Sequence, residues 1–445
     1  MFGSAETSTP PAALTGSMRD FRVPHGSNLL DRVNGFFHWQ DLRRQSGLWP
    51  FCRSTEEGPS AVCSARDDRG LSMRGVNFAS QDYLSLSSHP AIKQVATETI
   101  ARYGVHSAGS PALVGNTTHS VALERKIAEF LQMDEVVLFP TGWAAGFGVI
   151  KGLVRSADHI VMDSLAHTCL QEGAAAATRN VTLFRHLQVD ECRAKLRAIR
   201  AKDTDNGIMV VTEGLFSMDS DTPDLAAMQD LCREYNAILM VDVAHDLGSL
   251  GEEGRGHIGL QNMLGKVDLV MGSFSKTFAS NGGFVACKTR AVKEYLGFYS
   301  PPCTFSNALS PVQAATVLKA FQIVESEEGR QLRSSLLANV LSLRAELRDS
   351  GMEVYGDPSA IVCVKVGSEG LARLVGRRLP ELGLIANLVE FPAVPKGQAR
   401  FRMQVMAKHS PQNIFQAVER LRTGFDAATE EMHSVTEAPA LRAIA

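Results

Sequence analysis

Short apolar runs, rich in β-branched residues, alternate with stretches of helical periodicity through the middle of this 445-residue chain. Seven runs are candidate strands, at 136–139, 159–162, 181–184, 208–212, 237–241, 269–271 and 283–286. Helical patterns lie between them, for example at 123–131, 144–154, 190–201 and 224–235. This alternation predicts an α/β fold with a mainly parallel seven-stranded sheet flanked by helices.

The flanking regions differ from this middle in composition, which divides the chain into five segments. Residues 1–25 are rich in Ser, Thr, Pro and Gly and are expected to be a mobile leader, and 26–75 form an N-terminal segment with a helix at 30–45. A large domain is expected at 76–305. A smaller C-terminal α/β domain at 306–425 has a long helical pattern at 312–350 and strands near 361–366 and 401–405, and 426–445 is a tail expected to fray.

The charge and cysteine content exclude several classes of protein. A formal net charge of -3 with no long basic run gives no electrostatic reason to bind nucleic acid or anionic lipid. The eight cysteines are scattered and show no metal-type spacing with histidine, which favours a reduced compartment and no metal site. Neither a secretory signal nor an apolar run of membrane-spanning length is found, so we expect a soluble, cytoplasmic protein that acts on small molecules.

Lys276 lies in the motif GSFSKTFASNGGF at 272–284, directly after the apolar run 267–271. A lysine by itself indicates little, because most lysines are solvated surface charges. A lysine that leaves the end of a core strand among hydroxylated residues and glycines loses solvent, which favours its neutral, nucleophilic form and an imine with a carbonyl compound. The natural carbonyl partner is the aldehyde of pyridoxal 5'-phosphate (PLP), so we predict PLP as the cofactor.

A second motif, MVDVAH at 240–245, places Asp242 directly after another predicted strand. PLP needs a carboxylate at its pyridine nitrogen, because the protonated ring accepts the electrons of a substrate carbanion. Asp242 is the candidate for this contact, and His245 is a candidate partner of the phenolic oxygen. Taken alone, Asp242 is more simply a cap and His245 a satisfied polar residue. Ligands of such sheets lie beyond the carboxyl ends of the strands, where both Asp242 and Lys276 are expected.

Phosphate binding needs backbone N–H groups at a helix start together with hydroxyl groups. Gly142 and Trp143 open a predicted helix after a strand, and Ser273 and Ser275 flank the lysine. The alternative for the first pair is an ordinary capped turn. His167 follows another predicted strand, where its flat ring is suited to stack on a cofactor, although a lone histidine is more often structural.

Arg402 alternates with apolar residues in the motif ARFR at 399–402, as expected for a strand of the C-terminal domain. A guanidinium group offers paired donors to a carboxylate, so Arg402 suits an amino-acid substrate. A surface salt bridge is the alternative, and the spacing does not decide between them.

In their order and separation, these segments resemble the α-oxoamine synthase family of fold-type I PLP-dependent transferases, which includes serine palmitoyltransferase and 8-amino-7-oxononanoate synthase. The resemblance covers residues 75–425. Its marks are NFASQDYL at 77–84, TGWAA at 141–145, EGLFSMDSD at 213–221, DVAH at 242–245, GEEGRG at 251–256, the lysine motif, FSNAL at 305–309 and ARFR at 399–402.

The resemblance implies a role for each matching residue. It implies Lys276 as the Schiff-base lysine, Asp242 at the pyridine nitrogen, His245 at the phenolic oxygen, His167 stacked on the ring and Ser217 near the cofactor. Phosphate contacts are implied for the Gly142 and Trp143 backbone, Ser273 and Ser275, and for Ser306 and Asn307 of a second subunit, because members are homodimers with shared active sites. Arg402 and Gln81 are implied at the substrate carboxylate.

The implied reaction is a decarboxylative Claisen-type condensation of an α-amino acid with an acyl thioester such as acyl-CoA, which yields an α-amino ketone. The lysine motif resembles serine palmitoyltransferase, of sphingolipid biosynthesis, more closely, whereas FSNAL resembles oxononanoate synthase; a secondary-metabolite enzyme is also open. Substrate identity is put in doubt by five departures from the family pattern, which are Gln81, Trp143, Ala166, Val243 and Asp246.

Two other classes of function are considered. One is a PLP-dependent enzyme with a different reaction, and the other is a subunit without catalytic activity. A PLP-dependent aminotransferase or aldolase would use Lys276 and Asp242 without consuming a thioester. A non-catalytic partner subunit is expected to lack the lysine, so the presence of Lys276 argues against that interpretation.

Overall fold

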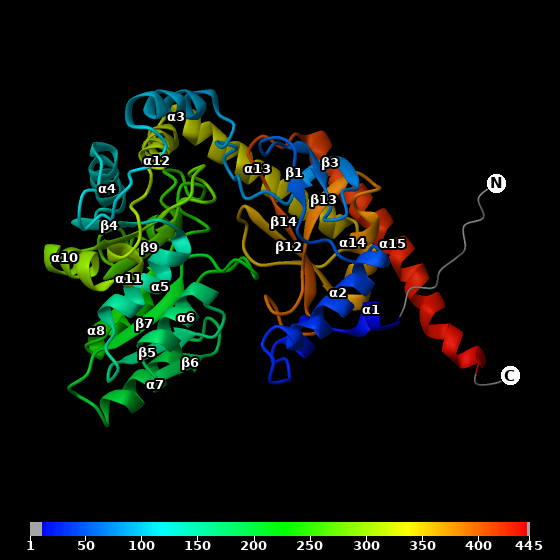
Figure 1. Ribbon diagram of the computed structural model, residues 1–445, viewed down its shortest axis with the longest axis horizontal. Coiled ribbons are helices and arrows are strands. Elements are labelled where there is room, and N and C mark those ends of the chain that lie inside the picture. Colours follow the sequence, from blue (N-terminus) through cyan, green and yellow to red (C-terminus); the bar gives the residue numbers. More distant parts are fainter. Residues whose placement is uncertain (1–10, 443–445) are drawn as a thin grey trace. The chain divides into compact units, whose positions relative to one another are not determined.

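The computed structural model describes residues 11–442 and contains two compact units (Figure 1). The large unit is Gln81–Leu337, and the split unit combines Met1–Ser80 with Ala338–Ala445. This division differs from the predicted segments in two places. The N-terminal residues group with the C-terminal ones, and residues 306–337 belong to the large unit, so the boundary falls inside helix α13 (Glu327–Asp349).

The large unit is built on a seven-stranded sheet of order β4-β10-β9-β8-β7-β5-β6. Its strands are β4 (Glu135–Phe139), β5 (His159–Asp163), β6 (Val181–Phe184), β7 (Ile208–Glu213), β8 (Ile238–Asp242), β9 (Leu269–Ser273) and β10 (Gly283–Cys287). The neighbouring strands β9, β8, β7, β5 and β6 pair in parallel. Strand β10 runs antiparallel to both β9 and β4. The predicted mainly parallel sheet and its seven strands are confirmed.

Helices cover both faces of this sheet. They are α3 (Pro90–Tyr103), α4 (Thr118–Leu131), α5 (Gly142–Leu153), α6 (Thr168–Ala177), α7 (Val189–Arg200), α8 (Leu225–Glu234), α9 (Gly256–Leu260), α10 (Arg290–Tyr299), α11 (Pro301–Thr304) and α12 (Pro311–Val324). Alternate strand residues such as Ile160, Met209 and Met271 form one core with Val149 of α5 and Leu170 of α6. The strands other than the edge strand β6 are largely buried on both faces, which explains their continuous apolar sequences.

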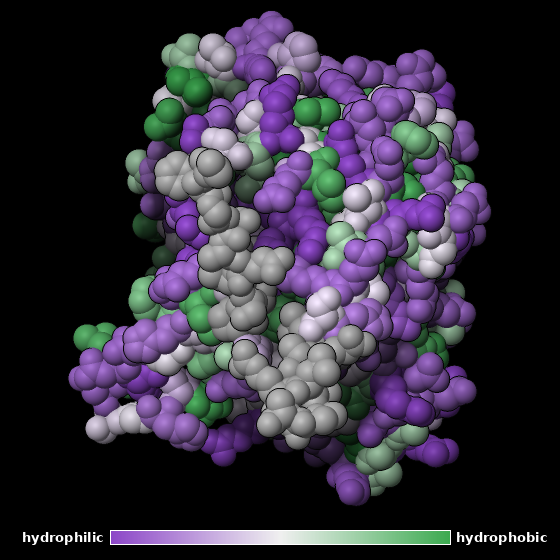
Figure 2. Space-filling model, turned by 90° about the vertical axis from the view of Figure 1, so that its right-hand side faces the viewer, coloured by the Kyte–Doolittle hydropathy of each residue, from purple (hydrophilic) through white to green (hydrophobic). Residues whose placement is uncertain are grey.

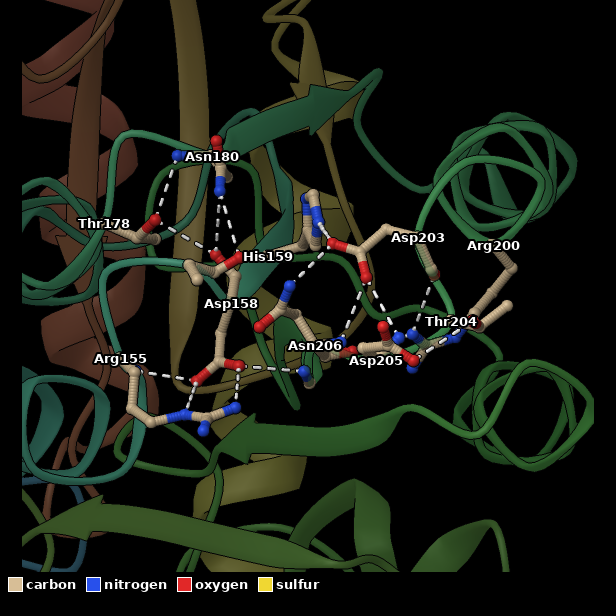
Figure 3. A network of polar contacts seen from close by, with 12 residues as sticks. Arg155, Asp158, His159, Thr178, Asn180, Arg200, Asp203, Thr204, Asp205 and Asn206 are labelled. Atoms are coloured by element: carbon tan, nitrogen blue, oxygen red, sulfur yellow. Dashed lines mark hydrogen bonds and ion pairs between the residues drawn. The ribbon is translucent and has the colours of Figure 1, made fainter.

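A polar network ties the amino ends of the parallel strands together (Figure 3). The carboxylate of Asp158 accepts hydrogen bonds from the Arg155 guanidinium and from the Gly207 N–H at 2.8 Å. His159, which begins β5, lies 2.9 Å from Asp203. The guanidinium of Arg200 donates to backbone carbonyls before β7 and β8. The loops that enter the sheet are therefore held by charged and backbone partners.

The split unit contains a second seven-stranded sheet of order β1-β2-β3-β13-β14-β12-β11. Its strands are β1 (Ser54–Thr55), β2 (Val62–Arg66), β3 (Ser72–Phe78), β11 (Val354–Tyr355), β12 (Ile361–Gly367), β13 (Leu384–Val389) and β14 (Ala399–Gln404). The pairing of β3 with β13 is parallel, with Val76 beside Leu384, and all other pairings are antiparallel. This pairing brings the N-terminal segment into the C-terminal sheet.

A buried ion-pair triad joins the same two parts of the chain. Arg43 of α2 (Asn34–Gln45) lies 2.7 Å from Glu390, which also binds Arg373 of α14 (Glu369–Arg378) at 2.8 Å. The Arg43 guanidinium lies over the rings of Trp39 and Trp49 at 4.9 and 5.0 Å from their centroids. A buried charge that lost its partner would cost several kcal/mol, so the triad fixes α2 onto the C-terminal elements of the split unit.

One sequence prediction for the periphery differs from the structure, and two, the mobility of the leader and the fraying of the tail, stay predictions. The helical pattern at 312–350 forms two helices, α12 and α13. The expected mobile leader includes α1 (Pro11–Thr15) and a 3-10 turn, η1 (Met18–Phe21), and its residues 1–10 lie outside the described part of the chain. A second 3-10 turn, η2 (Asp31–Val33), precedes α2. The tail expected to fray is helical to Arg442 as part of α15 (Pro411–Arg442).

None of the helices within residues 11–442 is long and apolar enough to cross a membrane. The face drawn in Figure 2 is mainly hydrophilic, with small hydrophobic groups between the polar ones.

Candidate active site

A cavity of about 260 Å³ lies at the carboxyl ends of β7, β8 and β9, beside the N-terminus of α5. Parallel strands end at one edge of a sheet, which brings together residues that are far apart in the chain. The predicted site residues that line the cavity are Gly142, Trp143, His167, Asp242, His245, Ser273, Ser275 and Lys276.

The other predicted site residues are placed elsewhere. Gln81, Ser217, Ser306 and Asn307 belong to the large unit but are not among the described residues that line the cavity. Ser306 donates its hydroxyl to the Pro302 carbonyl at 2.8 Å. Arg402 lies on β14 of the split unit. The roles of these five residues stay predictions.

Lys276 is carried into the cavity by a loop with a fixed backbone. The loop follows β9, and the Phe274 N–H donates to the Gly282 carbonyl at 3.0 Å, where the chain returns to β10. Phe274 and Phe278, which lie on either side of the lysine, are fully buried. Two buried rings and a closed loop therefore determine where the lysine side chain emerges.

Two carboxyl groups stand side by side at the edge of the sheet. Asp242 ends β8 and is paired in register with Glu213, which ends β7. Burial raises the pKa of both carboxyl groups, and the charge of Asp242 raises that of Glu213 further. The nearby His167 and Lys276 act in the opposite direction on Asp242 and favour its anion. A positively charged group in the cavity would stabilise this anion in the same way.

Glu213 lines the cavity, and the sequence interpretation gave it no role. Its carboxylate accepts a hydrogen bond of 2.6 Å from the His167 N–H, so it also fixes the backbone of a predicted site residue. The signal for Glu213 was present in the sequence, because it ends a strand as Asp242 does. Cys169 also lines the cavity, and nothing in the sequence pattern indicated it.

Both histidines of the cavity are held through the same ring nitrogen. The Nδ1 atom of His245 lies 2.9 Å from the hydroxyl of Tyr83. The Nδ1 atom of His167 accepts the Cys169 N–H at 3.3 Å and lies 3.0 Å from the Cys169 Sγ. The Nδ1 side of each ring therefore faces the protein.

The N-terminus of α5 forms a cradle with the hydroxyl groups after β9. Thr141 caps the helix by accepting the Ala144 N–H at 3.0 Å. A Cβ atom on Gly142 would lie 2.3 Å from the Cβ of Ser273, so only glycine allows this close approach. The Ser273 and Ser275 hydroxyls are 2.8 Å apart. Helix N–H groups and two hydroxyls fit the phosphate of PLP, and Lys276 and Asp242 fit its aldehyde and its ring nitrogen.

Comparisons with known proteins agree with this geometry. The family model for aminotransferase class I and II matches residues 74–421. The chain is 36% identical to the 8-amino-7-oxononanoate synthase of Trichlorobacter lovleyi over 84% of its own length and 93% of that protein. It is 33% identical to the serine palmitoyltransferase of Sphingobacterium spiritivorum, over 91% of this chain and 98% of that one.

A solved structure of SPT with its PLP internal aldimine has a similar fold, with a TM-score of 0.84 and 25% sequence identity. The match covers 90% of this chain and 99% of that structure. Fold, cofactor chemistry and relatives thus lead to one assignment. The chain belongs to the aminotransferase class I and II family and, within it, to the α-oxoamine synthases, which are PLP-dependent acyltransferases.

Proposed function

We propose that this enzyme condenses L-serine with a long-chain acyl thioester, with loss of carbon dioxide, as a serine palmitoyltransferase-like enzyme of sphingolipid biosynthesis. The observation that carries the PLP-dependent condensation is the convergence of Lys276, Asp242 and two histidines on one cavity beside a helix N-terminus. The length of the match to the serine palmitoyltransferase, 91% of this chain, supports this member of the family.

The residues of the cavity divide the binding of the cofactor between them. The α5 N–H groups at Gly142 and Trp143, with Ser273 and Ser275, hold the phosphate. Asp242 would hold the pyridine nitrogen, His245 would contact the phenolic oxygen, and His167 would cover the ring. When bound, PLP supplies an electron-accepting ring that stabilises negative charge at the α-carbon of an amino acid.

The side chains of the protein then move the protons. The Lys276 amine would hold the cofactor, and its free form would remove the proton from the amino-acid α-carbon. Asp242, buried at the end of β8, would place its negative charge at the ring nitrogen. An imidazole N–H of His245 or His167 donates to the oxyanion that develops on the thioester carbonyl. Arg402 and Gln81 orient the amino-acid carboxylate, and Ser217 supports the cofactor site.

A second candidate is an enzyme that makes 8-amino-7-oxononanoate, and the 36% identity to such a synthase favours it. The structure of that product requires alanine as the amino acid and a seven-carbon acyl chain with a terminal carboxylate. The two candidates share the cofactor and the lysine, so only the substrates distinguish them.

We also propose a homodimer that works in the cytoplasm. Apolar side chains near Ser306 and Asn307 are unusually exposed, including Leu113 at 82%, Val114 at 88% and Phe305 at 87%. Their two segments are joined by the Ala308 N–H to Gly109 carbonyl bond. A second copy would cover this surface, and its Ser306 and Asn307 would reach the phosphate. The eight free cysteines support a reducing compartment.

The test is a matrix of substrates on the purified enzyme loaded with PLP. Serine, alanine and glycine are each combined with palmitoyl-CoA, a seven-carbon dicarboxylic acyl-CoA and acetyl-CoA. Release of the CoA thiol and the mass of the amino ketone are measured. We expect the largest kcat/KM with serine and palmitoyl-CoA.

The other outcomes identify the alternatives. The largest rate with alanine and the dicarboxylic thioester would replace the main proposal by the second candidate. Formation of a keto acid or an aldehyde without CoA release would indicate an aminotransferase or an aldolase. A purified chain that binds no PLP would indicate a non-catalytic subunit.

A further inference from the structure

Tyr83 is a buried residue whose hydroxyl group contacts a histidine of the cavity. The hydroxyl oxygen lies 2.9 Å from the Nδ1 atom of His245, and the exposed fractions of the two residues are 0% and 8%. Tyr83 itself is not among the described residues that line the cavity. It therefore contacts a residue of the site from behind.

The direction of this hydrogen bond decides what His245 presents to the cavity. A neutral imidazole carries its proton on one nitrogen, and the bond made by one nitrogen determines the state of the other. If the Tyr83 hydroxyl donates to Nδ1, the proton of the ring is on Nε2, which is then a hydrogen-bond donor. If Nδ1 donates to Tyr83, Nε2 is an acceptor and cannot donate to an anionic oxygen.

His167 provides a comparison within the same cavity. Its Nδ1 accepts a backbone N–H, that of Cys169, at 3.3 Å. A backbone N–H can only donate, so this hydrogen bond favours the neutral form of His167 that carries its proton on Nε2. The contact at Nδ1 of His245 is instead made by a side-chain hydroxyl, which a substitution can remove.

The backbone around Tyr83 is fixed independently of the sheet. The carboxylate of Asp82 accepts the N–H groups of Leu86 at 2.9 Å and of Ser87 at 3.1 Å, which closes a turn. Leu84 and Leu86 are fully buried beside it. The hydroxyl of Tyr83 is thus held at the position of the imidazole by a rigid turn.

We propose that Tyr83 is a positioning residue for the reaction: its hydroxyl donates to Nδ1 of His245 and keeps the Nε2–H of His245 as a donor. This inference rests on the proposed function, in which His245 binds the phenolic oxygen of the cofactor. Tyr83 performs no chemical step itself. It acts through the orientation and the tautomer of the imidazole, as outer partners of ligating histidines do.

The first measurement examines the protein without cofactor. The apoprotein is labelled with ¹⁵N in its histidine rings, and solid-state NMR reads the protonation of each nitrogen. A difference spectrum against His245→Gln assigns His245 among the 12 histidines of the chain. We expect His245 and His167 both to carry the proton on Nε2, and Tyr83→Phe to change the ¹⁵N shifts of His245 alone.

The matched control is Tyr103→Phe, which removes another tyrosine hydroxyl of the large unit. That hydroxyl lies 2.8 Å from the Thr118 hydroxyl, away from the cavity. The control should leave the shifts of both histidines unchanged. A wild-type His245 with its proton on Nδ1 would overturn the inference, and this result does not depend on whether any variant folds.

The second measurement uses the enzyme loaded with PLP. For Tyr83→Phe we expect kcat to fall by about 10- to 100-fold, as for outer partners of ligating histidines, with little change in the KM for the amino acid. The pH dependence of the cofactor absorbance should shift in Tyr83→Phe and not in Tyr103→Phe. A folded Tyr83→Phe enzyme with unchanged kcat, absorbance and ¹⁵N shifts would contradict the role. Failure of the proposed function is a separate result, because it is seen in the wild-type substrate matrix.

Discussion

The two ends of the parallel sheet in the large unit use charged residues in opposite ways. At the amino end, Asp158 and Asp203 accept several hydrogen bonds each (Figure 3). Burial by itself would raise the pKa of Asp158, but its donors outweigh burial and lower the pKa, and hydrogen bonds from His159 and Asn206 lower that of Asp203. At the carboxyl end, burial raises the pKa of Glu213 and Asp242.

This difference in pKa indicates that the carboxylates at the amino end stabilise the fold, whereas those at the carboxyl end are suited to bind a charged ligand. A carboxylate with a lowered pKa is more stable as an anion in the folded protein than in the unfolded chain, so it favours folding at neutral pH. A buried carboxyl group with a raised pKa opposes folding once it is ionised. Active sites retain such groups because a charged ligand makes use of them.

The largest expected effect concerns the carboxyl end. Lys276→Ala should lower the rate of CoA release by at least about 10²- to 10⁴-fold, because the amine that moves the α-proton is removed. Circular dichroism should show an unchanged fold. The matched substitution at the opposite end is Lys202→Ala, an exposed residue that follows α7, and it should leave the rate unchanged. A Lys276→Ala enzyme with near-normal turnover would refute the role of this lysine.

The second-largest predicted effect is a loss of folding stability at the amino end of the sheet. Asp158→Ala should lower the free energy of unfolding by about 1–3 kcal/mol, because the Gly207 N–H and the Arg155 guanidinium lose the buried carboxylate that accepts their hydrogen bonds. Denaturant titration measures this loss, and kcat/KM should stay within about twofold of the wild type since the cavity is at the other end. Asp230→Ala serves as the control, because the side chain of Asp230 is 76% exposed in its pair with Arg233. Equal stability of the two variants would show that the network does not stabilise the sheet.

The smallest predicted effect is an increase in stability. Glu213→Gln should raise the free energy of unfolding of the apoprotein at neutral pH by about 0.5–2 kcal/mol, while its amide oxygen still accepts the His167 N–H. The raised pKa of Glu213 predicts the pH dependence. Stability from this group is complete below the pKa of a free glutamate and is lost as pH rises through the pKa in the folded protein.

Unfolding curves between pH 4 and pH 9 test this sign. The wild type should lose more stability than Glu213→Gln as pH rises through that range. Parallel curves for the two proteins, or a less stable Glu213→Gln, would show that the carboxyl group at this end does not oppose folding.

Much of the large unit could be predicted from the sequence, for a physical reason. Strands buried on both faces must be continuously apolar, so the strands other than the edge strand β6, in which Leu183 is exposed, have a clear local signal. The strands of the split unit have weaker local signals in the sequence. Strands β1 and β11 have two residues each, and β3 pairs with β13, which lies some three hundred residues further along the chain. No local pattern contains such a pairing.

The sequence by itself determined the sheet of the large unit and the positions of Lys276 and Asp242 at its carboxyl edge. Parallel strands end together, Asp242 directly follows an apolar run, and Lys276 lies in the motif that follows another. Only the tertiary structure showed that Glu213 lies beside Asp242, that the Tyr83 hydroxyl reaches His245, and that the N-terminal segment completes the second sheet. These contacts join residues far apart in the chain. They are decided by the packing of whole elements, which no local spacing of residues encodes.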